Sequence, residues 1–262
     1  MRKIIRKSLL YKTDVEYGDY TINHVFGCHH GCLFPCYAFQ MAKRFGNVKS
    51  YKEWIEPKIV SNALELLDRE IPKYKKDIKN VQLSFTTDPF MYGFEEVKEL
   101  TLRIIERLNK DDIKAVILTK GIIPEEATKL RKYNEFGISL VSLNDGFKKK
   151  YEPFTAPYLD RIASLKMMHD AGFSTWVSIE PFPTPNVSEE DLDHLLDSIS
   201  FVDKIIFGRW HYNKIISEYK NYKAFYNKCA EKVVDFCKKN NIHCHIKHGT
   251  YMVNKKIIEI DF

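Results

Sequence analysis

One complete strand–helix–strand unit lies in residues 81–120, which read VQLSFTTDPFMYGFEEVKELTLRIIERLNKDDIKAVILTK. Val81–Phe85 and Ala115–Thr119 are short, mainly apolar runs, and such runs predict buried strands. Between them, Glu95–Leu108 repeats apolar side chains every three or four residues, which predicts a helix with one buried face. Two strands joined through a helix run parallel, so this stretch predicts a βαβ unit.

The same alternation continues on both sides of this unit. Further strands are predicted at Tyr20–Phe26, Ile138–Leu143, Thr175–Ile179, Lys204–Phe207 and Ile242–Ile246. Further helices are predicted at Lys58–Arg69, Leu159–Asp170, Glu190–Ile199 and Lys220–Lys239. We therefore predict an α/β fold, a partial (β/α) TIM-type barrel of about six to seven parallel strands. We expect one domain over residues 1–262, with a core at 20–210 and a C-terminal helix and strand at 215–262.

Composition excludes several classes of protein. The chain has 262 residues, 44% hydrophobic and 29% charged, which excludes wholesale disorder. No apolar run reaches the roughly 18 residues that a membrane span needs, and the basic N-terminus lacks the long apolar stretch of a secretory signal. We therefore expect a cytoplasmic protein with no membrane partner. The formal net charge of +6 permits an anionic partner without requiring one.

Three cysteines, Cys28, Cys32 and Cys36, are spaced three residues apart in a loop rich in glycine and proline. Such a loop can wrap three thiolates around one metal site. Iron–sulfur clusters prefer thiolate ligands, and a cubane held by three leaves one iron open. A zinc knuckle completed by His29 or His30 is the competing metal site, and unligated thiols are the third possibility. Cys229 and Cys237, eight residues apart on a predicted helix, are expected to be core thiols. The histidines around Cys244 could form a second metal site, but ordinary alternating burial along a strand is favoured for them: His243, His245 and His248.

Polar side chains follow almost every predicted strand, and the carboxyl ends of barrel strands carry the chemistry in this class of fold. A thiol, two acids, a lysine, an amide, an arginine and a histidine are expected to converge there: Cys28, Asp88, Glu180, Lys120, Asn144, Arg209 and His248.

In this order the motifs resemble the radical S-adenosylmethionine (radical SAM) superfamily, in its spore photoproduct lyase-like branch. The likeness covers roughly residues 20–190 and rests on these segments: Gly27–Ala38, Ser84–Phe90, Ile117–Gly121, Ser142–Asn144, and Tyr151–Pro153 ahead of Arg161. One departure is plain, because the cysteines follow a CX3CX3C pattern where the family usually has two residues in the second gap.

The resemblance implies a [4Fe–4S] cluster on Cys28, Cys32 and Cys36, with S-adenosylmethionine bound to the open iron. One electron would then cleave the sulfonium bond, and a 5′-deoxyadenosyl radical would take hydrogen from a substrate. The implied reductant is an electron donor of the flavodoxin or ferredoxin type.

The resemblance also implies which residues bind S-adenosylmethionine. Phe34 would shield its adenine, with Tyr37 nearby, and Asp88 would accept from its ammonium group, with Thr87 beside it. Lys120 would pair with its carboxylate, and Ser142 and Asn144 would hydrogen-bond to its carboxylate or ribose. The simpler structural interpretations are a helix cap at Asp88, a solvated lysine at Lys120, and ordinary turn residues at Ser142 and Asn144.

Outside these motifs, Glu180, Arg209 and His248 are our substrate candidates. A strand-end acid and neighbouring aromatic and basic side chains suit a small planar, nucleobase-like molecule, and a lyase of the queuine (deazapurine) salvage type is one form of this hypothesis. DNA repair is a competing function, but Phe85 stands where the resembling lyases carry a hydrogen-donating cysteine. Nucleic acid is therefore a partner that we do not favour. The sequence also permits RNA or peptide modification, and it permits a non-catalytic iron–sulfur or zinc module.

Overall fold

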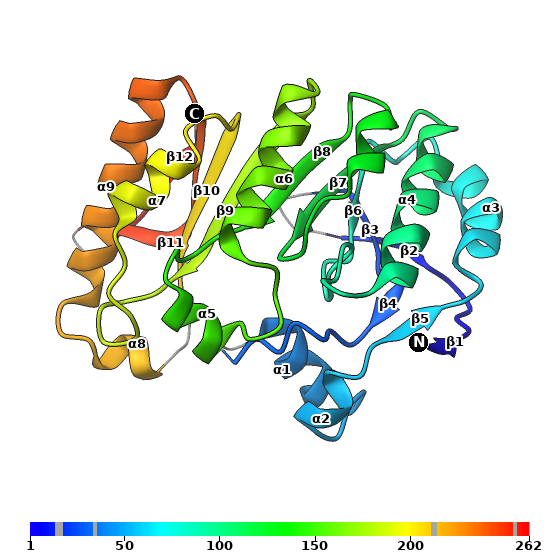
Figure 1. Ribbon diagram of the computed structural model, residues 1–262, viewed down its shortest axis with the longest axis horizontal. Coiled ribbons are helices and arrows are strands. Elements are labelled where there is room, and N and C mark those ends of the chain that lie inside the picture. The colour runs from blue at the N-terminus through cyan, green and yellow to red at the C-terminus, as the bar shows by residue number, and fades with distance from the viewer. Residues whose placement is uncertain (14–17, 34–35, 211–213, 254–255, 262) are drawn as a thin grey trace.

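The computed structural model describes residues 1–13, 18–33, 36–210, 214–253 and 256–261, and its centre is one nine-stranded sheet (Figure 1). From edge to edge the strands are β12 (Lys256–Asp261), β11 (His243–Val253), β10 (Lys204–Arg209), β9 (Ser174–Phe182), β8 (Glu135–Ser139), β7 (Lys114–Thr119), β6 (Asn80–Leu83), β3 (Tyr20–Ile22) and β2 (Leu10–Lys12). Within this described part, β3 and β6–β11 pair in parallel, and β2 and β12 are antiparallel edges.

The two edge strands each pair on one side only among the described residues, so the sheet is open. This arrangement confirms the predicted α/β partial barrel of parallel strands. The helices that pack beside the sheet include α3 (Ala63–Tyr74), α4 (Glu95–Asn109), α6 (Tyr158–Asp170), α7 (Leu192–Ser198) and α9 (Tyr222–Asn240). In α4, the buried face carries Val97, Ile104, Ile105 and Leu108, as its periodicity predicts.

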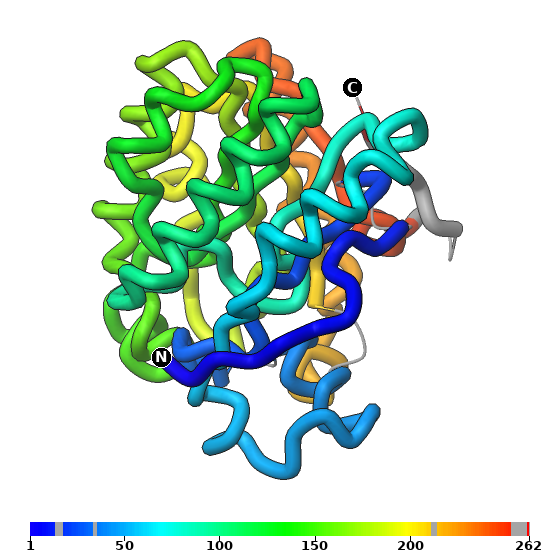
Figure 2. Tube along the Cα trace, turned by 90° about the vertical axis from the view of Figure 1, so that its right-hand side faces the viewer, coloured from blue at the N-terminus to red at the C-terminus, as the bar shows by residue number. Residues whose placement is uncertain are grey.

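The other helices are α1 (Tyr37–Arg44), α2 (Tyr51–Trp54), α5 (Asp145–Tyr151), α8 (Lys214–Glu218) and the 3-10 helix η1 (Glu125–Lys129). A second sheet has three strands in the order β1 (Arg2–Ile4), β5 (Lys58–Val60) and β4 (Val25–Phe26). Figures 1 and 2 both show α1 and α2 projecting from one end of the molecule, the end at which α5 also lies.

Three predicted boundaries were wrong. The apolar run Tyr20–Phe26 is divided between β3 and β4. The predicted helix at Lys58–Arg69 begins with strand β5, because Ile59 and its neighbours pair with both β1 and β4. The run Ile138–Leu143 extends past the end of β8, and its last part is buried beneath α5. An apolar run identifies burial but does not by itself distinguish a strand from a buried turn.

Large side chains cover the face of the sheet that points away from the main core. Val116, Trp176 and Ile206 form a small buried cluster there. The strand beside Trp176 carries Gly137, where an added Cβ would lie 2.4 Å from the indole ring. This packing excludes a continuous pore, and polar chemistry is left to the carboxyl ends of the strands. In the described part of the chain, no helix is long and apolar enough to span a membrane.

Candidate functional site

The loop that joins β4 to α1 carries the three clustered cysteines. Cys28, Cys32 and Cys36 are half-buried free thiols. The Cys28 amide donates to the Trp54 carbonyl at 3.0 Å, and both Cys28 and Cys36 pack on the apolar cluster around Trp54. Gly31, at φ 65°, turns the loop where an added Cβ would lie 2.7 Å from the Phe154 ring. The α2 region and Phe154 therefore hold the loop from two sides.

The three thiols are close enough to influence one another's ionisation. Burial raises the pKa of Cys28, and negative charge on Asp88, Cys32 and Cys36 raises it further. Burial also raises the pKa of Cys32 to about 12, although the ammonium group of Lys120 opposes this effect. Bringing three thiolates together is therefore costly unless a cation compensates their charge. The donor set fits an iron–sulfur cluster, which supplies that charge and prefers thiolates.

The histidines of this loop are engaged elsewhere. The amide of Tyr92 donates to His30 Nε2 at 2.9 Å, and His30 Nδ1 lies 3.5 Å from Asp88 Oδ2. Burial lowers the pKa of His30 to about 4, so the ring is neutral. His29 donates from Nδ1 to the Ile55 carbonyl at 3.1 Å. Both ring nitrogens of His30 face other partners and His29 Nδ1 donates to a backbone carbonyl, so the loop offers no ready fourth ligand for zinc among these two histidines. This geometry favours the iron–sulfur hypothesis over a zinc knuckle.

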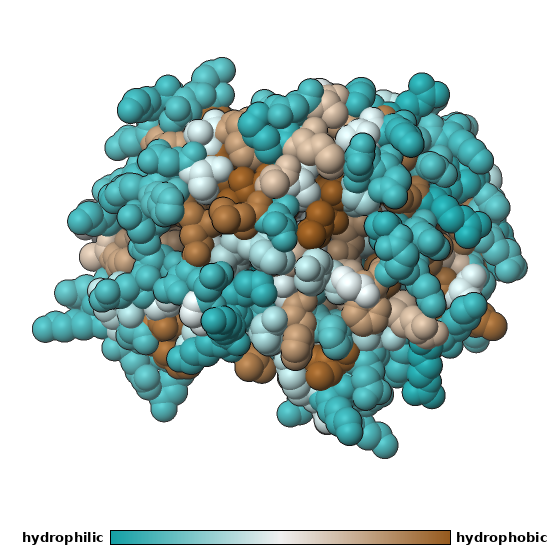
Figure 3. Space-filling model, in the orientation of Figure 1, coloured by the Kyte–Doolittle hydropathy of each residue, from teal (hydrophilic) through white to brown (hydrophobic). Residues whose placement is uncertain are grey.

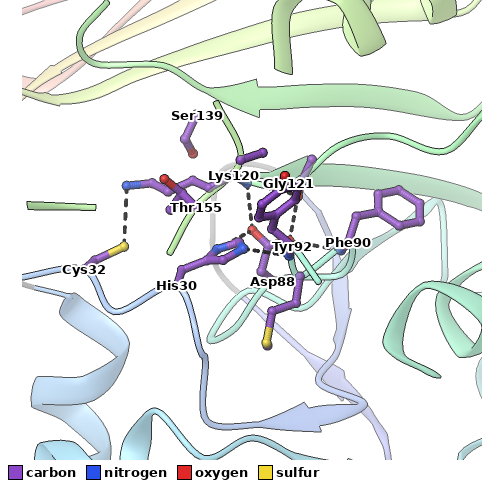
Figure 4. A network of polar contacts seen from close by, with 12 residues as sticks. His30, Cys32, Asp88, Phe90, Tyr92, Lys120, Gly121, Ser139 and Thr155 are labelled. Carbon is purple, nitrogen blue, oxygen red and sulfur yellow. Dashed lines mark hydrogen bonds and ion pairs between the residues drawn. The ribbon is translucent and has the colours of Figure 1, made fainter. Parts of the chain in front are cut away.

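Asp88 joins the loop after β6 to the end of β7 (Figure 4). Its Oδ1 accepts from the Thr119 hydroxyl at 2.6 Å and from the Phe90 amide at 2.9 Å, and its Oδ2 accepts from the Lys120 amide at 2.7 Å. The two segments touch closely, because a Cβ on Gly121 would lie 1.7 Å from the Phe90 carbonyl oxygen. Asp88 thus fixes the loop after β6 to the end of β7, and its contact with a cofactor ammonium group stays a prediction.

Lys120 is at the centre of a buried chain of charges. Its ammonium group pairs with Glu152 and lies 4.0 Å from Cys32 Sγ, and Figure 4 shows the side chain reaching toward this thiol. Glu152 Oε2 lies 3.1 Å from Arg161 Nη2, and the Glu152 and Arg161 side chains are 1% and 0% exposed. Burial opposes ionisation of Glu152, but Lys120 and Arg161 outweigh it and lower the pKa to about 2. The carboxylate is therefore charged and holds Lys120 in place.

Sequence reasoning assigned no role to Glu152 or Arg161, and it considered His30 only as a zinc ligand. All three belong to the segments that carry the family resemblance, and that was the available signal. Arg161 donates to the carbonyls of Ala156 and Ser139 as well as to Glu152, so it fixes the turn before α6.

The remaining cofactor candidates are placed as follows. Ser142 is buried and donates to Glu190 at 2.7 Å, while Asn144 caps α5 by accepting from the Gly146 amide. The Thr87 hydroxyl donates to the Val25 carbonyl at 3.5 Å. Tyr37 is 59% exposed, and its ring meets Phe85 edge to face at 6.4 Å. Phe34 lies outside the described residues. The cofactor roles of these residues stay predictions.

The three substrate candidates lie on neighbouring strands, Glu180 and Arg209 near the carboxyl ends of β9 and β10 and His248 in the middle of β11. Glu180 Oε2 lies 3.5 Å from the ammonium group of Lys247, and the two side chains meet over Gly208, the strand position between them. Arg209 follows Gly208, and its buried Nε donates to no acceptor among the described residues. His248 is exposed. The structure therefore brings Glu180 and Lys247 together, and sequence reasoning did not single out Lys247.

Known proteins share this architecture. A point mutant of spore photoproduct lyase matches 96% of this chain and 82% of its own, with a TM-score of 0.64 at 14% identity. Spore photoproduct lyase complexed with dinucleoside spore photoproduct matches 84% of this chain and 66% of its own, with a TM-score of 0.58 at 16% identity. At these identities the likeness shows the fold alone.

A relative and a family model extend this result. The uncharacterized protein ORF301 of Acidianus two-tailed virus is 24% identical over 193 residues, 69% of this chain and 61% of that protein. The chain thus spans less than two thirds of this relative's length. The model of the radical SAM superfamily matches residues 22–199, more than half of the chain. The chain therefore belongs to the radical S-adenosylmethionine superfamily, whose enzymes use a [4Fe–4S] cluster and S-adenosylmethionine.

Proposed function

We propose that this radical SAM enzyme holds its cluster on Cys28, Cys32 and Cys36 and takes hydrogen from a small planar, nucleobase-like substrate in a lyase-type reaction. When bound, the cluster and S-adenosylmethionine supply one-electron cleavage of the sulfonium bond to give a 5′-deoxyadenosyl radical. The observation that carries the proposal is the half-buried Lys120, paired with the buried Glu152 and 4.0 Å from Cys32 Sγ.

Lys120 suits the carboxylate of S-adenosylmethionine, because an ammonium group is a compact charge with three donors. Its ammonium group is already positioned before the cofactor binds, since it pairs with Glu152, which Arg161 holds in turn. Preorganisation of this kind lowers the entropy that binding costs. Asp88 supports the same region from the neighbouring loop through the Lys120 backbone amide.

The substrate half of the proposal rests on Glu180 and on two rings. Glu180 is 25% exposed and its ion pair with Lys247 is 3.5 Å long, so the carboxylate is accessible to a ligand that donates N–H groups. Tyr37 and Phe85 supply aromatic surface next to the cysteine loop. A planar ring with amine or ring N–H groups, such as a deazapurine base, matches both features.

DNA repair is the second candidate, and the fold likeness to spore photoproduct lyase with its dinucleoside favours it. Against it, Phe85 supplies no thiol to return a hydrogen atom to the product. Repair by this chain therefore requires another hydrogen donor, and we favour the small substrate.

The test is substrate-dependent turnover. Anaerobically reconstituted protein is incubated with dithionite, S-adenosylmethionine and each of a panel of purine, deazapurine and pyrimidine bases, and separately with dinucleotide lesions. We expect one base to be consumed together with S-adenosylmethionine, and mass spectrometry to detect its cleavage product. Turnover of a dinucleotide lesion instead would overturn the proposed substrate class and leave the radical chemistry intact.

A further inference from the structure

The outer side of the cysteine loop is hydrogen-bonded to the segment that follows α5, which lies at the surface of the molecule. The Leu33 amide donates to the Tyr151 carbonyl at 2.8 Å, and the Phe154 amide donates to the His30 carbonyl at 3.3 Å. The segment that ends α5 and leads to α6 therefore runs alongside the loop and is bonded to it at His30 and at Leu33, on either side of Cys32. The inner side of the loop faces Lys120 and Asp88, which belong to the site already described.

This outer surface combines exposed apolar groups with positive charge. We define the α5 surface as Leu33, Lys148, Lys149, Lys150 and Phe154. Leu33 is 57% and Phe154 47% exposed, and the three lysines form the last turn of α5. Figure 3 shows apolar side chains reaching the surface among polar ones in the lower middle of this face. Asp145 is the only acid within α5, so this helix, which the structure describes in full, is basic.

A cleft of about 500 Å³ continues the α5 surface and reaches the cysteine loop. Its lining includes Lys148 and Phe154, together with His29, which is the neighbour of Cys28. The ring of His29 stacks on that of Phe154 with centroids 5.1 Å apart. The acids at the start of α4, on the far side of the cleft, are engaged: Glu95 pairs with Lys98, and Glu96 accepts from the N-terminal amine.

We propose that the α5 surface is the docking site for an acidic one-electron carrier protein of the flavodoxin or ferredoxin type. The inference rests on the proposed function, because only a redox cluster in this loop needs an electron. An apolar centre flanked by lysines suits a transient partner of opposite charge. The carrier loses one electron and the cluster gains it, so no bond forms or breaks in the docked complex.

The experiment compares two reductants on two variants. The test variant carries Lys148→Gln, Lys149→Gln and Lys150→Gln. The matched control carries Lys73→Gln, Lys76→Gln and Lys79→Gln, which removes the same charge from exposed positions in and after α3. Formation of 5′-deoxyadenosine is measured with limiting reduced flavodoxin and, separately, with dithionite.

We expect the test variant to lose about ten-fold in the flavodoxin-driven rate at low ionic strength, because steering by opposite charges accelerates association. The loss should shrink as salt is added, since exposed charges are screened beyond roughly 10 Å at 0.1 M. The dithionite-driven rate and the melting temperature should equal those of the unmodified protein, and the control should behave like the unmodified protein with both reductants.

An unchanged flavodoxin-driven rate in the test variant overturns the docking proposal, and so does an equal loss with dithionite and flavodoxin. A loss of the flavodoxin-driven rate in the control as large as in the test variant also overturns it, because general net charge then explains the effect. If the unmodified protein forms no 5′-deoxyadenosine even with dithionite, the proposed function fails, and the docking proposal fails with it.

Discussion

Two groups of charged side chains lie on or after the parallel strands: Asp88, Lys120 and Glu152, called the cofactor half, and Glu180 and Lys247, called the substrate half. The two halves differ in how their charged side chains are held. At the ends of β6 and β7, Asp88 and Lys120 are bound by internal partners, and Glu152 behind them is 1% exposed. On β9 and β11, Glu180 and Lys247 are 25% and 19% exposed and form an ion pair of 3.5 Å. A site that always holds the same cofactor gains from rigid groups, whereas a substrate half needs groups that can exchange partners. Variants of the two halves should therefore fail in different ways.

The largest effect is expected from the cysteine loop. Cys32→Ala should abolish the cluster and the formation of 5′-deoxyadenosine together, a loss of at least about a thousand-fold, because an open iron requires three protein thiolates. Iron and sulfide content, visible absorbance and the product assay measure this. Cys229→Ala is the matched control, since this thiol is buried in α9 away from the loop, and its cluster content should be normal. Full activity in Cys32→Ala would show that the loop is not the cluster site.

Removing the carboxylate of Glu152 should produce the largest loss of stability in the cofactor half. Glu152→Gln leaves the fully buried Arg161 and the 20% exposed Lys120 without their counter-ion, and breaking a buried ion pair costs about 3–5 kcal/mol. Urea unfolding measures the free energy. Glu135→Gln is the matched control, because Glu135 also bridges two lysines but is 19% exposed, so its loss should be clearly smaller. Equal losses in the two variants would refute the special role of the buried network.

The same carboxylate predicts a dependence on pH. The pKa of Glu152 is lowered from 4.5 to about 2, so its contribution to stability is fully present above about pH 4.5 and is lost as the pH falls toward 2. The difference in unfolding free energy between the unmodified protein and Glu152→Gln should therefore be constant near neutral pH and shrink in acid. A difference that grows as the pH falls would contradict this assignment.

In the substrate half, Glu180→Gln should raise KM for the substrate about ten- to a hundred-fold, because a charge-assisted hydrogen bond becomes a neutral one. Cluster content and KM for S-adenosylmethionine should not change, since Glu180 pairs with Lys247 across β10, whereas the cysteines lie on the loop between β4 and α1. Steady-state kinetics in both substrates separate these effects. An increased KM for S-adenosylmethionine with unchanged substrate binding would move Glu180 to the cofactor half.

The smallest effect is expected at His248. Its side chain is exposed on β11, so His248→Ala should change stability by less than about 0.5 kcal/mol and activity by about two-fold. Kinetics of the variant beside Glu180→Gln measure the difference. A loss as large as that of Glu180→Gln would place His248 firmly among the substrate contacts.

Much of the fold followed from local pattern. The helix predicted at Glu95–Leu108 is α4, Glu95–Asn109. Apolar side chains repeated at helical spacing over this length are buried together only when the segment is a helix. The helix predicted at Lys58–Arg69 begins too early, because pairing of β5 with β1 and β4 overrides local preference. The sequence pattern indicates which residues are buried, and strand partners distant in sequence decide whether those residues form a strand or a helix.

The site divides in the same way. The rule that chemistry gathers at strand ends located Asp88 and Lys120. It could not reveal that Glu152 and Arg161 stand behind Lys120, since these residues follow in a turn and a helix and meet it only through the fold. For Lys247, the clue was a glycine: Gly208 leaves the space over which Glu180 and Lys247 meet.

The central claim is that the loop carrying Cys28, Cys32 and Cys36 holds a redox-active cluster that cleaves S-adenosylmethionine. The most direct measurement is the yield of 5′-deoxyadenosine from anaerobically reconstituted protein with dithionite and S-adenosylmethionine, together with its metal content. We predict a brown protein with about four irons that forms 5′-deoxyadenosine. A colourless protein that binds one zinc ion and forms none would contradict the account.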